Sequence, residues 1–327
     1  MNGSQKAPLL EVDNLVVHFY TRGGIVQGSR GVSFHVGYGE TLGIVGESGS
    51  GKSVSVQAVM GLIGSPGKIE GGDIRYMGRS LLDKSGRKYV RKVRGKEISM
   101  IFQDPMTSLN PVFTIGTQIT EVLRHHMKMD KNQARKRAME LLGLVEINAP
   151  EKRLKQYPHE MSGGMRQRVM IAIALACDPQ LIIADEPTTA LDVTIQAQIL
   201  DLLTDLQKRL NVSVILITHD LGVVAQMSHR VAVMYAGRII EQGDVDNIFA
   251  DPVHPYTKGL IRATPSLGEV TERMVSIDGV PPNLITPPPG CAFSPRCEHA
   301  KDGCGKPQSL KAIGNDRHVS CWCATHR

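Results

Sequence analysis

The chain has 327 residues, of which 41% are hydrophobic and 21% charged, and a formal net charge of +6 at pH 7. This composition is ordinary for a globular protein, and the length suggests one large domain with an appendage, or two domains. It excludes a membrane-spanning chain, because the longest apolar run, Val169 to Cys177, is far too short to cross a bilayer. The first eight residues lack the apolar core of a signal peptide, so a cytoplasmic protein is expected.

The first third of the chain predicts strands followed by a helix. Residues 9–19, 32–36 and 42–45 have the apolar patterns of strands, and the last of these leads into a glycine-rich segment. A helix is predicted from about Lys52, because the apolar residues that follow recur at helical spacing. Residues 98–102 read as another buried strand.

The remainder predicts a helical block and then strands alternating with helices. Residues 115–177 are mostly helical in pattern, and the strands 181–184 and 212–218 flank an amphipathic helix at 195–210. Residues 230–242 predict a hairpin. This alternation indicates an α/β fold with parallel strands, interrupted by an inserted α-helical subdomain at about residues 104–177.

Composition changes near residue 250. Ten of the eighteen prolines and five of the six cysteines lie beyond it, and the apolar periodicity fades. We therefore predict a main domain at residues 9–250 and a loop-rich C-terminal extension at 251–327 with too little apolar content for a large core of its own.

One segment matches the phosphate-loop pattern G-x-x-x-x-G-K-[ST] at every position. It reads Gly46-Glu47-Ser48-Gly49-Ser50-Gly51-Lys52-Ser53. Its glycines let backbone N–H groups face phosphate oxygens, and the helix that follows presents its N-terminus to the same anion. Lys52 is expected to reach the β- and γ-phosphates of ATP, and Ser53 to ligate Mg²⁺.

Polar residues that follow three other strands complete the predicted catalytic site. Asp185 ends an apolar strand and is expected to hold the Mg²⁺ shell, while Glu186 is placed to polarise the attacking water as general base. His219 follows the strand 212–218 and is expected to contact the γ-phosphate. Gln103 follows the strand 98–102 and is a hinge candidate that touches Mg²⁺ and the water.

With Ser162-Gly163-Gly164 between Gln103 and Asp185, this set of motifs resembles, in order, the nucleotide-binding subunit of ATP-binding cassette (ABC) transporters. The resemblance covers about residues 9–250. It implies a P-loop NTPase (RecA-like) core with an antiparallel β subdomain, and that Phe19 (or Tyr20) stacks on adenine. It also identifies Asp192 with the family's D-loop. One departure is Met165, where the family signature usually has glutamine.

The resemblance implies a mechanism shared between two chains. Ser162, Gly163 and Gly164 would bind the γ-phosphate of ATP that is held by the opposite subunit, at the N-terminus of a helix. ATP would then join two cassettes, and hydrolysis would release them. A lone chain is expected to be a poor ATPase.

Finer resemblance points to the dipeptide, oligopeptide and nickel importer branch of the family. It rests on residues 102–111, 185–194 and 254–257. This branch implies a second, different ATPase subunit, two integral membrane permeases that dock at 102–111, and an extracytoplasmic solute-binding protein, with the chain on the cytoplasmic face of the membrane. Peptide is the expected cargo, with nickel or an oligosaccharide as the alternatives.

The extension carries five cysteines, and in a cytoplasmic chain clustered thiols indicate metal ligands rather than disulfides. They are Cys291, Cys297, Cys304, Cys321 and Cys323. Zinc-finger spacing is absent, and four thiolates can equally hold a [4Fe–4S] cluster. Some peptide-importer ATPases with this C-terminal pattern resemble iron–sulfur proteins, so the first four cysteines are predicted to bind [4Fe–4S], with Zn²⁺ and free thiols as the alternatives. Cys323 is expected to be spare.

Two other classes of function remain open. One is a soluble cassette ATPase in DNA repair or translation, although such families carry two cassettes on one chain or a long coiled-coil insertion. The other is a redox or metal sensor in which ATP only regulates. The basic run at residues 84–96 is read as a solvated face, with anionic lipid as the sharper alternative; nucleic acid is not expected, because no aromatic residues interleave it.

Overall fold

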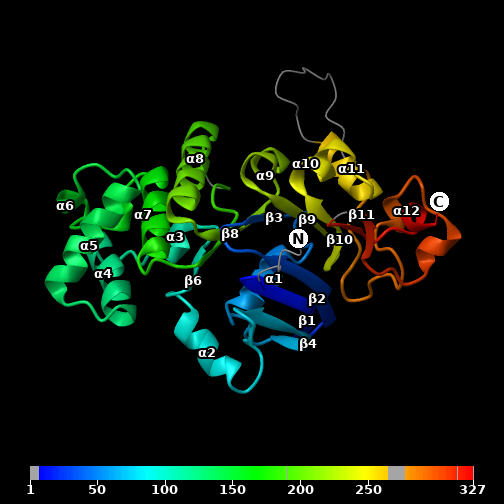
Figure 1. Ribbon diagram of the computed structural model, residues 1–327, viewed down its shortest axis with the longest axis horizontal. Coiled ribbons are helices and arrows are strands. Elements are labelled where there is room, and N and C mark those ends of the chain that lie inside the picture. Colours follow the sequence, from blue (N-terminus) through cyan, green and yellow to red (C-terminus); the bar gives the residue numbers. More distant parts are fainter. Residues whose placement is uncertain (1–6, 190, 264–276, 315, 327) are drawn as a thin grey trace, which may run out of the picture. The chain divides into compact units, whose positions relative to one another are not determined.

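The computed structural model describes residues 7–189, 191–263, 277–314 and 316–326 (Figure 1). The chain forms two compact units, the first from residues 1–37, 41–87 and 216–327 and the second from 38–40 and 88–215. Parts of the predicted C-terminal extension, residues 264–276, 315 and 327, lie outside the described residues. The chain passes from one unit to the other within helix α2 and again within strand β8.

The first unit contains an antiparallel sheet with the strand order β2-β1-β4-β5. Its strands are β1 (Leu10–Thr21), β2 (Gly24–Val36), β4 (Gly67–Tyr76) and β5 (Arg79–Ser80). Alternation of apolar and polar residues buries one face of β1, including Leu10, Val12, Leu15 and Val17. This sheet is the antiparallel β subdomain expected from the sequence.

A second set of paired strands in the same unit carries the phosphate loop. Strand β3 lies parallel to β9, and antiparallel neighbours follow in the order β9-β10-β12-β11. All five residues of β3 are buried, as in a strand that is covered on both faces. The bounds are β3 (Thr41–Val45), β9 (Arg230–Tyr235), β10 (Arg238–Asp244), β11 (Lys311–Gly314) and β12 (Arg317–Val319).

Short helices complete the first unit. They are α1 (Lys52–Val59), α9 (Leu221–Met227), α10 (Val245–Ala250), α11 (Pro255–Arg262) and α12 (Trp322–Thr325), with 3-10 turns at Ser294–Arg296 and Asp302–Gly305. Within the described residues, the extension does not build a separate large core. Instead, Phe293 packs against the rings of Tyr235 and Tyr256, with centroids 5.5 and 5.3 Å apart, so the extension shares the core of the unit.

The second unit is mainly helical. Its helices are α2 (Gly86–Val93), α3 (Pro105–Ser108), α4 (Ile115–His126), α5 (Lys131–Leu144), α6 (Pro150–Arg153), α7 (Gly163–Leu175) and α8 (Val193–Leu210), with a 3-10 turn at Pro158–Glu160. The strands are β6 (Ile98–Ile101) and β7 (Leu181–Asp185), which pair in parallel, and β8 (Ser213–Thr218) begins here. Side chains cap the longer helices: Thr114 caps α4, Asp130 forms a capping box on α5, and Asp192 caps α8.

Most of the predicted elements are confirmed, but β2 begins at Gly24, well before the predicted residue 32. No strand was predicted at Gly67–Tyr76, where alternation is weak and, within that strand, Ile74 and Tyr76 are buried. The basic run holds helix α2, which buries Val93 and leaves Arg87, Lys88, Arg91 and Lys92 exposed, so the predicted solvated face is a helical one. None of the described helices is both long enough and apolar enough to cross a membrane.

Candidate nucleotide-binding site and cysteine cluster

The phosphate-loop motif occupies the turn between β3 and α1 in the first unit. Gly51 caps α1 with φ of 99°, a left-handed conformation that favours glycine, and a Cβ there would meet the carbonyl oxygen of Gly28. The N–H of Gly237 donates to the carbonyl of Ser50 at 2.9 Å, which fixes the inner side of the loop. Ser48 and Gly49, at the tip, are exposed. The loop is therefore supported by Gly237 and exposed at its tip, as an anion-binding turn requires.

Lys52 is buried at the start of α1 and bends back over the loop. Its ammonium donates to the carbonyl oxygens of Gly46, at 2.7 Å, and Glu47, at 3.1 Å. The neighbouring Ser53 lies in the first turn of the same helix. The lysine thus carries its charge to the concave side of the loop, where the N-terminus of α1 also favours an anion.

The two aromatic candidates on β1 differ in their surroundings. Phe19 is half-buried, and its ring lies against the backbones of Gly28 and Gly67, where an added Cβ would come within 2.8 and 2.7 Å of ring atoms. Tyr20 is 47% exposed and donates its hydroxyl to Glu70 at 2.7 Å. The assignment of adenine stacking to Phe19 stays a prediction.

His219 lies directly after β8, as the sequence predicted, and its side chain is exposed. The next residue, Asp220, caps α9 by accepting from the N–H groups of Gly222 and Val223. The histidine is therefore held at the junction of a buried strand and a capped helix.

In the second unit, β7 ends at Asp185, and Glu186 follows it in a left-handed conformation with φ of 47°. A non-glycine residue is strained there, and such strain is concentrated at functional sites. The Glu186 carboxylate accepts from Gln103 Nε2 and from Thr189 Oγ1, each at 2.9 Å. The structure thus brings two predicted catalytic residues, Gln103 and Glu186, into direct contact.

The Ser-Gly-Gly signature forms the start of α7. Ser162 is the N-cap, and its hydroxyl accepts from the N–H of Met165 at 3.3 Å. A Cβ at Gly164 would come within 2.7 Å of Ile195 on α8, so glycine lets the two helices approach closely. The predicted capping of α7 is confirmed, and the first N–H groups of this helix remain suited to a phosphate.

The predicted nucleotide-site residues fall into two sets. The first unit holds Phe19, His219 and the loop Gly46, Glu47, Ser48, Gly49, Ser50, Gly51, Lys52 and Ser53. The second unit holds Gln103, Ser162, Gly163, Gly164, Asp185, Glu186 and Asp192. Sequence reasoning missed Thr189, which its position three residues after Glu186 could have suggested.

The five cysteines of the extension gather in the first unit. The N–H of Cys291 donates to the carbonyl of Cys304 at 2.8 Å, although thirteen positions separate them in the sequence. Burial raises the pKa of the Cys291 thiol to about 11, with smaller contributions from Cys321, Cys304 and Cys297. Burial, with these neighbouring thiols, also raises the pKa values of Cys297 and Cys321. The four cysteines predicted as ligands therefore lie close enough to influence one another.

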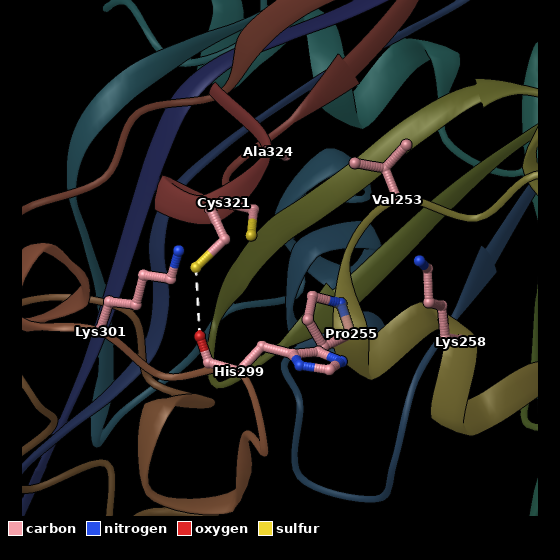
Figure 2. A pocket seen from close by; sticks show the side chains of 8 residues that line it. Val253, Pro255, Lys258, His299, Lys301, Cys321 and Ala324 are labelled. Carbon is pink, nitrogen blue, oxygen red and sulfur yellow. Dashed lines mark hydrogen bonds between the residues drawn. The ribbon is translucent and has the colours of Figure 1, made fainter. Parts of the chain in front are cut away.

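Cys323, the predicted spare thiol, donates to the carbonyl of His299 at 3.2 Å. It lines a cavity of about 330 Å³. Cys321, His299, Lys301 and Lys258 line the same cavity (Figure 2). Cys177, the last residue of the apolar run Val169 to Cys177, belongs to the second unit and is buried in its core.

A metal site is not formed by these side chains. Within the described ranges, no group of three or more His, Cys, Asp or Glu side chains is arranged to hold a metal ion. This geometry does not fit the Zn²⁺ alternative, which needs four ligands around one ion. It gives no support to the [4Fe–4S] prediction either, although a four-iron cluster spreads its thiolates more widely than one ion does.

A buried polar pair ties the extension to β10. Glu241 is completely buried and accepts from the N–H groups of Val253 and His254, each at 2.9 Å, and from Arg317 at 3.0 Å. The His254 ring accepts from the N–H of Tyr256, so its proton is on Nε2, which faces Cys291 Sγ at 4.0 Å. These contacts therefore connect Cys291 with the start of α11, and the start of α11 with β10 and β12.

Comparison with known proteins gives a consistent result. Residues 29–189 match the ABC transporter family, and residues 240–304 match the family described as oligopeptide/dipeptide transporter, C-terminal region. The oligopeptide transport ATP-binding protein OppD of Bacillus subtilis (strain 168) is 58% identical over 96% of this chain and 88% of that protein. The dipeptide transport ATP-binding protein DppD of the same organism is 53% identical over 98% of this chain and 96% of that protein.

A solved structure shares the fold. A dimeric ATP-binding cassette in a post-hydrolysis state, bound to ADP and Pi, superposes with a TM-score of 0.63 at 28% identity, covering 72% of this chain and 98% of that one. The two units with their phosphate loop, signature helix and strained glutamate define a nucleotide-driven ATPase. The chain belongs to the ATP-binding subunits of the ABC transporters, in the oligopeptide/dipeptide branch, and it hydrolyses ATP. The predicted fold class and enzyme class are confirmed.

Proposed function

We propose that this ATPase powers the import of dipeptides or oligopeptides through partner permeases. The observation that carries this proposal is the match over nearly the full chain to peptide-transport ATP-binding proteins at more than 50% identity, together with the oligopeptide/dipeptide C-terminal region. Nickel and oligosaccharide are the alternative cargoes, and both would use the same ATPase mechanism.

For the chemistry, we propose roles for individual residues of each unit in the binding and hydrolysis of ATP. Lys52 and the loop N–H groups bind the phosphates of ATP, and Ser53, Gln103 and Asp185 would hold Mg²⁺ when it is bound. Glu186 is the general base, oriented by its hydrogen bond from Gln103 Nε2. His219 contacts the γ-phosphate, and a metal ion would supply further charge neutralisation on the phosphates.

We further propose that two half-sites from different chains close each ATP. Ser162, Gly163 and Gly164 at the start of α7 offer N–H groups to the γ-phosphate held by the other subunit. Asp192, the N-cap of α8, belongs to the same half-site. The solved relative in its ADP- and Pi-bound state is a dimer, which supports pairing. A second, different ATPase subunit is the partner we propose.

Docking to the permeases is assigned to the segment that follows β6. Phe102, Val112 and Phe113, all near or within this segment, are 43%, 71% and 46% exposed, so it presents large apolar side chains to solvent. We propose that two integral membrane permeases cover it, that the chain lies at the cytoplasmic face of the membrane, and that an extracytoplasmic solute-binding protein delivers the cargo.

Peptide uptake by a strain lacking the chain tests this proposal. Restoring the wild-type chain should restore growth on a required dipeptide or tripeptide, and two integral membrane proteins should co-purify with it in mild detergent. Recovery of nickel accumulation without peptide uptake would favour the alternative cargo. Co-purification of nucleic acid or ribosomes in place of membrane proteins would contradict transport altogether.

We retain a [4Fe–4S] cluster on Cys291, Cys297, Cys304 and Cys321 as a separate proposal. It rests on the clustering of cysteines in the extension, on the backbone hydrogen bond that places Cys291 beside Cys304, and on the small apolar content of the extension, which ligation would stabilise. Anaerobically purified protein should be brown and contain about four iron atoms per chain. Colourless protein that contains neither iron nor zinc would leave the cysteines as free thiols and contradict the proposal.

A further inference from the structure

Glu47, the second residue of the phosphate loop, is held at its backbone and its side chain by residues from far along the chain. Its carboxylate accepts two parallel hydrogen bonds from Arg296, Nη1 to Oε2 at 2.9 Å and Nη2 to Oε1 at 3.1 Å. Its N–H donates to the hydroxyl of Tyr256 at 2.9 Å. Both partners belong to the region beyond residue 250, and all three residues lie in the first unit.

The same residue is also tied to the phosphate-binding groups of the loop. The carbonyl oxygen of Glu47 accepts from Lys52 Nζ at 3.1 Å and from the N–H of Ser50 at 3.2 Å. The position of Glu47 therefore decides where the lysine and the following N–H groups lie.

The side chain of Arg296 is buried and is held by several hydrogen bonds. Its side chain is only 6% exposed, compared with 25% for Glu47. Its remaining donors bind the hydroxyl of Tyr235 and the carbonyl oxygens of Ile277 and Asp278, at 2.8–3.2 Å. Its guanidinium also lies 5.7 Å from the centre of the Phe293 ring. A bidentate pair between a buried guanidinium and a carboxylate is geometrically restrictive, unlike an exposed ion pair.

We propose that Arg296 is a positioning residue for ATP binding: it holds the phosphate loop in its anion-binding shape through Glu47, with Tyr256 fixing the backbone of the same residue. The extension is then a structural support of the nucleotide site. This inference rests on the proposed role of Lys52 and the loop in binding phosphates.

The test measures the affinity of the purified full-length chain for MgADP by calorimetry. Arg296→Ala should raise Kd about tenfold, the effect of losing one charge-assisted contact. Glu47→Ala should have a similar effect, and the double variant should be no worse than either single one, because both break the same link. Arg296→Lys keeps the charge but cannot donate two parallel hydrogen bonds, so its Kd should lie between those of Arg296→Ala and the wild type.

Arg317→Ala is the matched control. It removes a partly buried arginine of the same extension, whose partner is Glu241 on β10 rather than a residue of the loop. Its affinity for MgADP should equal that of the wild type at a temperature where thermal unfolding shows each variant to be folded. If Arg317→Ala weakens binding as much as Arg296→Ala, or if the double variant shows the product of the two single effects, the inference is wrong.

Two further outcomes separate this inference from the proposed function. Wild-type affinity in Arg296→Ala, with a large loss in Lys52→Ala, would overturn only the positioning role. Wild-type affinity in Lys52→Ala would overturn the phosphate-binding role of the loop as well. If Arg296→Ala does not fold, Arg296→Lys decides, and wild-type affinity in that variant overturns the inference.

Discussion

The phosphate loop and the cysteine-bearing extension are held in shape by different kinds of interaction. The turn of the loop is formed by its own backbone hydrogen bonds, left-handed glycine and the first turn of α1, and contacts from Gly237, Tyr256 and Arg296 support it from further along the chain. The extension has short strands and 3-10 turns, and its position depends on side chains such as Arg296, Arg317 and Phe293 that reach other elements. Local motifs therefore specify the chemistry, whereas long-range side-chain pairs specify the support.

The largest expected effect concerns the catalytic residue. Glu186→Gln should lower ATP hydrolysis by roughly 10²- to 10⁴-fold, because the amide cannot accept the proton of the attacking water. ATP binding should be retained. Phosphate release and nucleotide binding, measured on the same preparation of the assembled transporter, check this prediction. Equal hydrolysis by the wild type and the variant would contradict the assignment of the general base.

Lys52→Ala is expected to act on binding instead. The ammonium lies against the carbonyl oxygens of Gly46 and Glu47, and its loss should weaken affinity for MgATP by about tenfold or more. Fluorescent nucleotide titration measures the change, and Lys96→Ala serves as a control at an exposed lysine. Unchanged affinity would show that the loop does not bind the phosphates.

A variant of the extension sharpens the comparison with the loop. Arg317→Ala leaves the fully buried Glu241 with only its two backbone donors, so the free energy of unfolding should fall by about 3 kcal/mol. Hydrogen exchange should rise most at β10 and β12. Urea denaturation gives the magnitude, and a loss of less than the error of the measurement would show that this pair does not hold the extension.

The smallest expected effect is a dependence of stability on alkaline pH. Burial raises the pKa of Cys177 from 9.0 to about 11, so the unfolded chain ionises this thiol first. The stabilising contribution is complete below the unfolded pKa and is lost as pH rises from about 9 to about 11. Wild-type protein should therefore lose more stability over this range than Cys177→Ala, as measured by urea denaturation at each pH. Identical pH profiles would contradict the prediction.

The nucleotide site was largely predictable because its signals are local. A strand ending in Asp185, a serine that caps α7 and a glycine-rich turn before α1 each follow from a few adjacent residues. The strain at Glu186 was not predictable, since nothing in its neighbourhood in the sequence requires a positive φ. The same holds for its contact with Gln103, which lies 83 positions away.

The long-range contacts that support the phosphate loop could not be predicted from short stretches of sequence. Arg296 and Glu47 are 249 positions apart, and neither belongs to a pattern that names the other. Helix α2 was read only as a basic run, because charged residues dominate its composition, although Tyr89, Val90 and Val93 recur at helical spacing. The sequence showed that the extension needs support beyond its own core, but not that it packs on Tyr235 and Tyr256.

Light scattering of the Glu186→Gln chain, with its partner ATPase subunit and with or without MgATP, tests most directly whether two cassettes share each nucleotide. The mechanism predicts that MgATP converts the separate chains into a stable pair and that Lys52→Ala, added to the same chain, prevents it. A chain that stays monomeric with ATP bound, while the wild type hydrolyses ATP at full rate alone, would contradict the mechanism.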